Sequence, residues 1–218
     1  MTVVPSDYDT DPERWRSRDR STQVYADVHK PVADRLVREH LEPVLDVGSG
    51  TGELTAHLPT GWSTVLLDRS WHQLIAAPGR RLHADALQLP IQNASVGAVT
   101  MLWMLYHVEE PITAIVEARR VLHRGGLFAA TTASRRNDPE LTDGYPPTPF
   151  DAEEAPDLVA SVFGHVAIER WDAPMTCLPD REAVLRYCRS HFLEANAADR
   201  VNPPVWLTKR GCLLFATR

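Results

Sequence analysis

The sequence has few of the features that would indicate a disulfide framework, a metal site or a membrane span. Its three cysteines, Cys177, Cys188 and Cys212, form no CxxC pair, and no two histidines share a metal-ligand spacing. No apolar run approaches the length of a membrane span, and the first residues, MTVVPSDYDTD, lack the charged-then-apolar pattern of a signal peptide. We therefore expect a cytoplasmic protein with no membrane partner and no metal.

An excess of positive charge is also missing. The 218 residues include 23 Lys and Arg against 29 Asp and Glu, which gives a formal net charge of −6. Proteins that bind nucleic acid normally gather basic residues on one face. The one short basic cluster here, between Arg14 and Arg20, is interleaved with acids and is typical of a solvated helix. We expect no nucleic-acid partner, and the sequence does not indicate an oligomeric state.

The chain does contain a regular alternation of short apolar runs and amphipathic stretches. This alternation is typical of an α/β fold with a parallel sheet and crossover helices, and the length suits a single domain over residues 1–218. Strands are predicted over residues 44–47, 64–67, 81–84, 96–102, 127–131, 166–170 and 212–217. Helices are predicted over residues 52–57, 71–76, 111–123, 152–162 and 181–195.

Three further segments are predicted to flank or cover this core. Val24, Val28, Val32 and Leu36 recur every four residues, as on one face of a helix. Pro31 interrupts the pattern, so we expect two helices there, the second beginning at Pro31 and ending before residue 43. Residues 1–30 are a predicted N-terminal lid. Residues 135–156, rich in Pro, Asp and Glu, are a predicted mobile loop, and residues 157–218 are predicted to shape the substrate site.

The strongest chemical signal is the segment DVGSGTG, from Asp46 to Gly52, between a predicted strand and a predicted helix. Gly48, Gly50 and Gly52 allow a sharp turn and let a ligand approach the backbone closely. The start of the helix offers free N–H groups, and Asp46 can accept from a ligand ammonium. Taken alone, such a turn could simply close a strand. Dinucleotide-binding sites use the different spacing GxGxxG.

Two more acids follow predicted strands. Asp68 ends the second strand, 22 residues after Asp46, and could accept from both hydroxyls of a ribose. It could instead belong to the helix N-cap region before Ser70. Asp85 follows the third strand and could accept from an adenine amino group, while the N–H of Ala86 donates to a ring nitrogen. The alternative is that Asp85 is a turn residue.

Taken together, the segments VLDVGSGTGEL, LLDRS, HADALQLP, SVGAVTMLWMLYHVEEP and RGGLFAATT resemble the successive motifs of class I S-adenosylmethionine-dependent methyltransferases. The resemblance covers residues 40–133 well and is closest to the small-molecule and ubiquinone/menaquinone-type enzymes. It implies a Rossmann-like, doubly wound, seven-stranded sheet, mostly parallel with an antiparallel last strand and with helices on both faces. It also implies that S-adenosyl-L-methionine contacts Asp46, Gly48, Ser49, Gly50, Gly52, Asp68, Arg69, Asp85, Ala86 and Leu102.

The implied reaction is transfer of a methyl group to an oxygen, nitrogen or carbon atom of a small molecule, such as one of secondary metabolism. His107, after the fourth predicted strand, is the candidate catalytic residue, because imidazole titrates near neutral pH. It could equally be a helix-start histidine bonded to backbone. Trp103, Tyr106, Trp171, Tyr187 and His191 are candidates for the pocket wall.

Other functions remain open at this stage. An NAD(P)-dependent oxidoreductase could use a related sheet, although the glycine spacing and the HADALQLP segment argue against it. A non-catalytic protein could retain the cofactor site for regulation or scaffolding. An RNA methyltransferase is disfavoured by the acidic balance of the chain.

Overall fold

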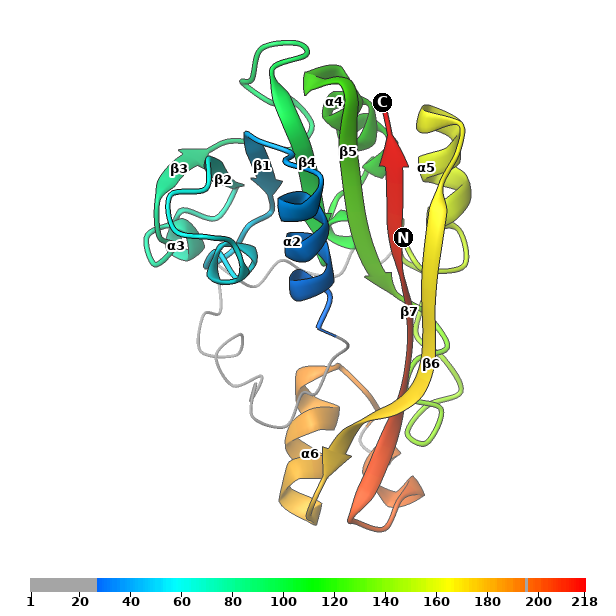
Figure 1. Ribbon diagram of the computed structural model, residues 1–218. Coiled ribbons are helices and arrows are strands. Elements are labelled where there is room, and N and C mark those ends of the chain that lie inside the picture. The colour runs from blue at the N-terminus through cyan, green and yellow to red at the C-terminus, as the bar shows by residue number, and fades with distance from the viewer. Residues whose placement is uncertain (1–26, 195) are drawn as a thin grey trace.

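The structure, a computed structural model, describes residues 27–194 and 196–218 and contains a seven-stranded sheet in the order β3-β2-β1-β4-β5-β7-β6 (Figure 1). The strands are β1 Val44–Val47, β2 Thr64–Asp68, β3 Arg80–His83, β4 Val96–Leu102, β5 Leu122–Ala133, β6 Ala167–Leu178 and β7 Val205–Thr217. The α-helices are α2 His29–Arg38, α3 Trp71–Leu74, α4 Pro111–Val121, α5 Ala155–Phe163 and α6 Arg181–Ser190. The described residues also form the 3₁₀ turns η2 Leu54–His57, η3 Leu105–His107 and η4 Ala197–Arg200.

The direction of the strands is the predicted one. The pairs β1–β2, β1–β4, β2–β3 and β4–β5 are all parallel. The last strand, β7, lies between β5 and β6 and is antiparallel to both. The predicted Rossmann-like sheet with an antiparallel last strand is therefore confirmed.

Helices cover both faces of the sheet, also as predicted. Successive residues of β5 point to opposite faces: Phe128 packs into the cluster that holds α4 and α5, whereas Leu127 packs into the cluster that holds α2. A strand buried on both faces reads as a continuous apolar run, which is why the runs in β1, β4 and the middle of β5 were recognisable. Within the described residues, no helix is both long and apolar enough to cross a bilayer.

Several predicted boundaries are wrong at the helix ends. The helix α2 begins at His29 and includes Pro31, because proline is tolerated in a first turn, where its missing N–H has no partner to lose. The predicted helix before it lies on residues outside those described, except for residues 27–30, of which 27 and 28 are not helical and 29 and 30 begin α2. The helix predicted over residues 111–123 ends two residues earlier, at Val121, because Leu122 already has extended backbone angles (φ −63°, ψ 138°). Residues 181–195 form a helix only as far as Ser190, and residues 52–57 form one only as the short 3₁₀ turn from Leu54.

The two C-terminal strands are much longer than predicted. The β5 strand pairs with β7 only from Gly211 onward, so the first half of β7, from Val205 to Arg210, pairs with β6 alone. We call this half of the hairpin, together with α6 and η4, the outer lobe. It extends beyond the rest of the sheet (Figure 1). Its own apolar cluster joins Leu178, Val184 and Leu207 to Leu141 of the loop after β5.

Candidate functional site

A cavity of about 1820 Å³ lies at the carboxyl ends of the parallel strands and reaches to the outer lobe. In a doubly wound sheet, the strand order reverses at the neighbouring strands β1 and β4, and ligands bind in the crevice outside the carboxyl ends there. Ten of the eleven residues proposed from the sequence line this one cavity: Asp46, Gly48, Ser49, Gly50, Asp68, Arg69, Asp85, Ala86, Leu102 and His107.

The glycine turn is built on backbone angles that favour glycine. Gly48, Gly50 and Gly52 have φ of +67°, +54° and +84°. The N–H groups of Gly48 and Ser49 both donate to the carbonyl of Leu67, at 2.7 and 3.1 Å, which holds the turn against β2. A Cβ at Gly50 would meet nothing within 4 Å, so the space over this residue is open toward the cavity.

The other two glycines are required by protein packing. A Cβ at Gly48 would lie 2.6 Å from Cβ of Met104, and one at Gly52 would lie 2.9 Å from Pro78. Gly52 is the one candidate that is absent from the cavity lining. Its position in the motif is thus accounted for by the close packing of the turn on Pro78 and Leu66.

Asp46, at the end of β1, is a nearly buried carboxylate with one strong partner. Its side chain accepts a 2.6 Å hydrogen bond from the hydroxyl of Thr100, and the residue is only 4% exposed. Burial raises the pKa of Asp46 to about 7; the bond from Thr100 opposes this, and the charges of Asp68 and Glu53 add to it. A cation placed beside Asp46 would favour the ionised form.

Asp68 takes part in the helix N-cap region, one of the two roles left open by the sequence, and also lines the cavity. One oxygen accepts from the N–H of Gly50 and the other from the N–H of Ser70, each at 2.8 Å. Ser70 is the N-cap of α3 and accepts from Gln73. These two bonds fix the orientation of the carboxylate beside the cavity. Asp85 likewise accepts from the N–H of Leu87 at 2.9 Å, as a turn residue does, while lining the cavity.

Asp46, Asp68 and Asp85 thus offer hydrogen-bond acceptors to a ligand at the ends of three successive strands. S-adenosylmethionine offers hydrogen-bond donors in the same number: an ammonium, a pair of ribose hydroxyls and an adenine amino group. The residues present therefore fit that ligand. A dinucleotide fits less well, because its negatively charged pyrophosphate would lie beside these acids near the turn. Arg69 is the nearby cation of the lining.

At the end of β4 the backbone turns sharply at Trp103, whose φ of +57° is uncommon for a bulky residue. Its N–H donates to the carbonyl of Thr131 at 3.3 Å, and its ring packs edge-on against Trp171 at 6.0 Å. The turn places Met104 over the glycine turn and leads into η3, where His107 lines the cavity with its ring 4.4 Å from that of Tyr106. The N–H of His107 bonds the carbonyl of Met104 within η3.

The opposite wall of the cavity contains two charged residues that sequence reasoning missed. Arg135 and Asp151 both line it, and Nη1 of Arg135 lies 3.4 Å from the carboxylate of Asp151. Arg135 also approaches Glu153 at 3.8 Å and Glu154 at 3.1 Å. The charges of this loop were visible in the sequence, but no local pattern indicates which of them turns inward. Within the described residues, no group of three His, Cys, Asp or Glu side chains could hold a metal ion.

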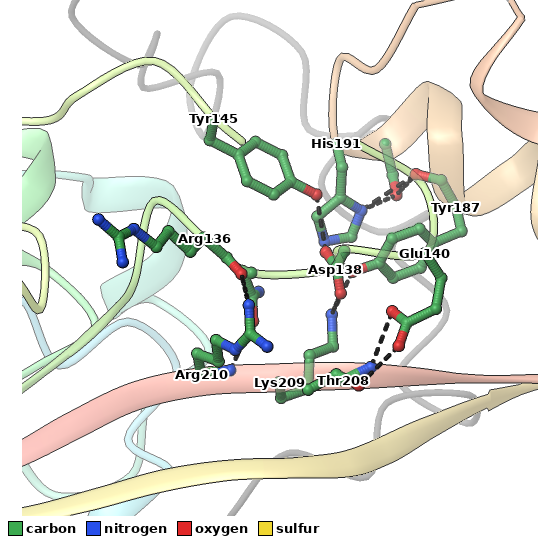
Figure 2. A network of polar contacts seen from close by, with 11 residues as sticks. Arg136, Asp138, Glu140, Tyr145, Tyr187, His191, Thr208, Lys209 and Arg210 are labelled. Carbon is green, nitrogen blue, oxygen red and sulfur yellow. Dashed lines mark hydrogen bonds and ion pairs between the residues drawn. The ribbon is translucent and has the colours of Figure 1, made fainter. Parts of the chain in front are cut away.

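The wall of the cavity next to the outer lobe, called the far wall below, depends on a buried polar network. The network joins the loop after β5, α6 and the outer half of β7 (Figure 2). Nζ of Lys209 lies 2.6 Å from the carboxylate of Asp138, and the two side chains are 2% and 0% exposed. The hydroxyls of Tyr145 and Tyr187 each donate to Asp138 at 2.7 Å. Burial lowers the pKa of Lys209, while the charge of Asp138 acts in the opposite direction.

Of the pocket-wall candidates, Trp103, Tyr106 and His191 line the cavity. Tyr187 does not: it lies in the network and stacks on His191 with ring centroids 3.9 Å apart. Trp171 packs on Trp103 from outside the lining. The network thus supports lining residues of the far wall, such as Tyr145 and His191, from behind.

Comparison with known proteins points in one direction. A family model described as a methyltransferase domain matches residues 45–130. An uncharacterized methyltransferase of Mycobacterium tuberculosis (strain H37Rv) is 30% identical over 161 residues, which cover 69% of this chain and 80% of that protein. A demethylmenaquinone methyltransferase of Clavibacter sepedonicus is 30% identical over 159 residues, 68% of this chain. A malonyl-[acyl-carrier protein] O-methyltransferase of a Marinomonas species is 29% identical over 148 residues, 61% of this chain.

The match to the last two relatives spans 64% and 55% of their lengths. Among solved structures, a putative methyltransferase of Haloferax volcanii in complex with the Trm112 activator has a TM-score of 0.62 at 16% identity, covering 98% of this chain and 97% of that one. The [4+2]-cyclase SpnF has a TM-score of 0.57 at 18% identity, covering 90% and 87%. At such identities the structures establish the fold alone.

Proposed function

Because the chain belongs to the class I S-adenosylmethionine-dependent methyltransferases, we propose that it transfers a methyl group from S-adenosylmethionine to a small-molecule acceptor. The observation that carries the proposal is the set of three carboxylates, Asp46, Asp68 and Asp85, which face one cavity beside an open glycine turn. Each carboxylate can accept from a different hydrogen-bond donor group of S-adenosylmethionine.

The cofactor contacts follow from this arrangement. We propose that Asp46 receives the ammonium, that Asp68 receives the ribose hydroxyls, and that Asp85 receives the adenine amino group. The backbone of Gly48, Ser49 and Gly50 lies along the ligand, and Arg69, Ala86 and Leu102 complete the contacts. Gly52 contributes through the packing of the turn.

S-adenosylmethionine supplies an electrophilic methyl group on a sulfonium, so the main task of the protein is to hold the acceptor in line with that group. Exclusion of water supports this task. We propose that residues 1–30, of which 1–26 lie outside the described residues, and the loop 135–156 close the cavity over the acceptor. Residues 157–218 shape its far wall as a part of the same single domain. His107 lies at the β4 side, where it can orient an acceptor or take a proton from it.

A small acceptor suits the chemistry of the lining better than a nucleic acid does. The described residues that line the cavity include nine acids and three arginines: Asp27, Asp46, Glu53, Asp68, Asp85, Glu109, Asp143, Asp151 and Glu194 against Arg69, Arg135 and Arg200. A phosphate backbone would meet repulsion along such a surface. Turnover of any acceptor separates the enzyme from a non-catalytic protein that only binds the cofactor.

Calorimetry tests the proposal directly. S-adenosylmethionine and S-adenosylhomocysteine are expected to bind, and NAD is not. Asp68→Ala is expected to weaken binding by about 1–3 kcal/mol, the usual loss for a hydrogen bond to a charged group. The same substitution should weaken binding of a 2′-deoxyribose analogue by less, because this analogue lacks one of the hydroxyls from which Asp68 would accept. Preference for NAD over both sulfur ligands would overturn the assignment.

A further inference from the structure

The part of the cavity away from the proposed methyl donor is where a second substrate has to lie. The three carboxylates proposed for the donor are at or just after the ends of β1, β2 and β3. The rest of the lining comes from the ends of β4 and β5, from the loops after them, and from residues 190–194 at the end of α6. We call this part the acceptor end. One of its residues, Phe192, is unusual in both backbone and side chain.

Phe192 ends α6 in a backbone conformation that favours glycine, with a φ of +55°. The N–H of Leu193 donates to the carbonyl of Cys188 at 3.0 Å, and the N–H of Phe192 donates to the carbonyl of Arg189 at 3.4 Å. These two bonds form the Schellman turn that commonly ends a helix. Its left-handed position is usually occupied by glycine, because a Cβ there lies too close to the following carbonyl oxygen.

Two other helices of the chain are followed by the same conformation, but with residues that tolerate it better. After α5 comes Gly164, with a φ of +88°, and shortly after α2 comes His40, with a φ of +52°. Histidine is enriched at positive φ, whereas a bulky aromatic residue is an outlier there. Glycine would end α6 with less strain, so the need to end the helix does not explain a phenylalanine.

Burial in the protein core does not explain the phenylalanine either. Phe192 is 51% exposed, and it lines the cavity. Leu193, the next residue, packs instead on the apolar cluster of the outer lobe. A ligand that covers exposed apolar surface in a cavity gains free energy from that burial. Strained residues that a fold retains are concentrated at sites that bind ligands.

A second bulky aromatic residue with a left-handed backbone lines the same cavity. Trp103 has a φ of +57° and directly follows β4, and Tyr106 of η3 lines the cavity close by in the chain. The acceptor end therefore receives aromatic side chains both from the sheet and from the turn after α6. Aromatic rings pack on other flat rings with a gain in free energy beyond the area that they bury.

We infer that Phe192 packs on a ring system of the acceptor from the side of the outer lobe, while Trp103 and Tyr106 contact it from the side of the sheet. The acceptor is therefore a flat, largely apolar molecule. This inference rests on the proposed methyl transfer and specifies its substrate class. Phe192 acts by position: its contact holds the acceptor ring so that the nucleophilic atom lies in line with the methyl group on the sulfonium.

The test uses the full-length protein saturated with S-adenosylhomocysteine. Ligand-observed NMR compares 2-naphthol with decahydro-2-naphthol, which has the same carbon skeleton and hydroxyl group but is saturated and not flat. Both alcohols are uncharged at pH 7, so charge does not distinguish them. We expect 2-naphthol to bind more tightly. Phe192→Ala is expected to weaken its binding about 10-fold, the loss of one aromatic contact.

Phe192→Gly separates the effect of the ring from the effect of the backbone. It removes the ring as Phe192→Ala does, but it also relieves the strain of the left-handed position. Both variants should therefore lose 2-naphthol binding to the same extent. The glycine variant should unfold at a higher denaturant concentration than the alanine variant, because glycine adopts this φ without steric cost.

Trp206→Ala is the matched control. Trp206 is another exposed aromatic residue of the outer lobe, at 55%, and it lies outside the cavity lining, so 2-naphthol binding should be unchanged. The inference would be overturned by equal binding of the two alcohols, by no binding of 2-naphthol, or by full binding in Phe192→Ala. Recovery of binding in Phe192→Gly, or an equal loss in Trp206→Ala, would also overturn it. If S-adenosylhomocysteine itself fails to bind the wild-type protein, the proposed function fails first, so the two failures are distinguishable.

Discussion

Asp46 shows how a single buried carboxylate can link ligand affinity to pH. Its pKa is raised from 3.8 in an exposed chain to about 7 in the fold, mainly by burial. The folded protein therefore binds a proton more tightly than the unfolded chain does between these pH values. The contribution of Asp46 to the free energy of unfolding falls as pH rises through that window and is constant above it.

A ligand ammonium prefers the ionised form of Asp46, so we predict that affinity for S-adenosylhomocysteine rises about tenfold between pH 6 and pH 8. This is the change in the ionised fraction of a group with a pKa near 7. Methylthioadenosine, which lacks the amino-acid part, should show a flat profile. Calorimetry across this pH range measures both slopes. Asp46→Asn should flatten the profile of S-adenosylhomocysteine, and a slope that persists in this variant would assign the pH dependence to another group.

His107 allows two roles to be separated by substitution. If it takes a proton from the acceptor, His107→Ala should lower turnover about 10²–10⁴-fold and leave affinity for S-adenosylhomocysteine nearly unchanged. The pH–rate profile should also lose its acidic limb. If it only orients the acceptor, His107→Asn should retain most of the activity, because an amide still forms hydrogen bonds. Wild-type turnover by the alanine variant from pH 6 to pH 9 would exclude both roles.

At the scale of elements, the outer half of β7 depends on a buried charge. Lys209→Met would leave Asp138 ionised and uncompensated in the interior, so we predict a loss of about 3–5 kcal/mol in the free energy of unfolding. Denaturant titration measures it. Adding Asp138→Asn should restore part of the loss, since the amide oxygen can still accept from the two tyrosine hydroxyls.

An exposed ion pair of the same region is the control. Arg200 and Asp143 are 41% and 94% exposed by side chain, and Arg200→Gln should cost less than about 1 kcal/mol. If Lys209→Met costs no more than this control, the network is not a major source of stability for the outer lobe.

The elements that the sequence predicted well are those whose burial is uniform. The runs VLDV and VGAVTML are buried along their whole length, and β1 and β4 have the predicted bounds. The outer half of β6 contains Pro174 and alternates between exposed and half-buried positions as far as that proline, with buried positions only at Thr176 and Leu178. The outer half of β7 contains Lys209 and Arg210. Such a polar composition does not read as strand, because the lysine is buried only through a partner elsewhere in the chain.

The candidate site divides in the same way. The residues proposed for the methyl donor lie in contiguous motifs at strand ends, so local sequence is sufficient to bring them forward as one cavity lining. Lys209 and Asp138 are 71 residues apart, and Arg135 and Asp151, which pair in the cavity lining, are 16 residues apart in a loop with several other charges. No local pattern carries either fact, since both depend on long-range packing.

At the scale of the whole molecule, the chain has a large sheet core and a smaller core in the outer lobe. The clusters of the sheet involve α2, α4 and α5, whereas the cluster of the outer lobe is centred on α6 and η4. They are connected through the continuous strands β6 and β7 and through Leu141 of the loop after β5. Separate apolar clusters often correspond to units that open at different free energies.

We predict that the two cores respond differently to ligand. The proposed site of S-adenosylhomocysteine is at the ends of β1, β2 and β3, so at 100 times its Kd the ligand should stabilise the sheet by about 2.7 kcal/mol. Native-state hydrogen exchange should show this increase for amides of β4 and little change for amides of α6, which opens at lower free energy. In Lys209→Met, protection should fall in α6 before it falls in β4, because the lost ion pair joins α6 to β7 through Asp138 and Tyr187. Equal opening free energies for both elements, rising together with ligand, would mean that the chain unfolds as one cooperative unit and that the outer lobe has no independent motion with which to admit the acceptor.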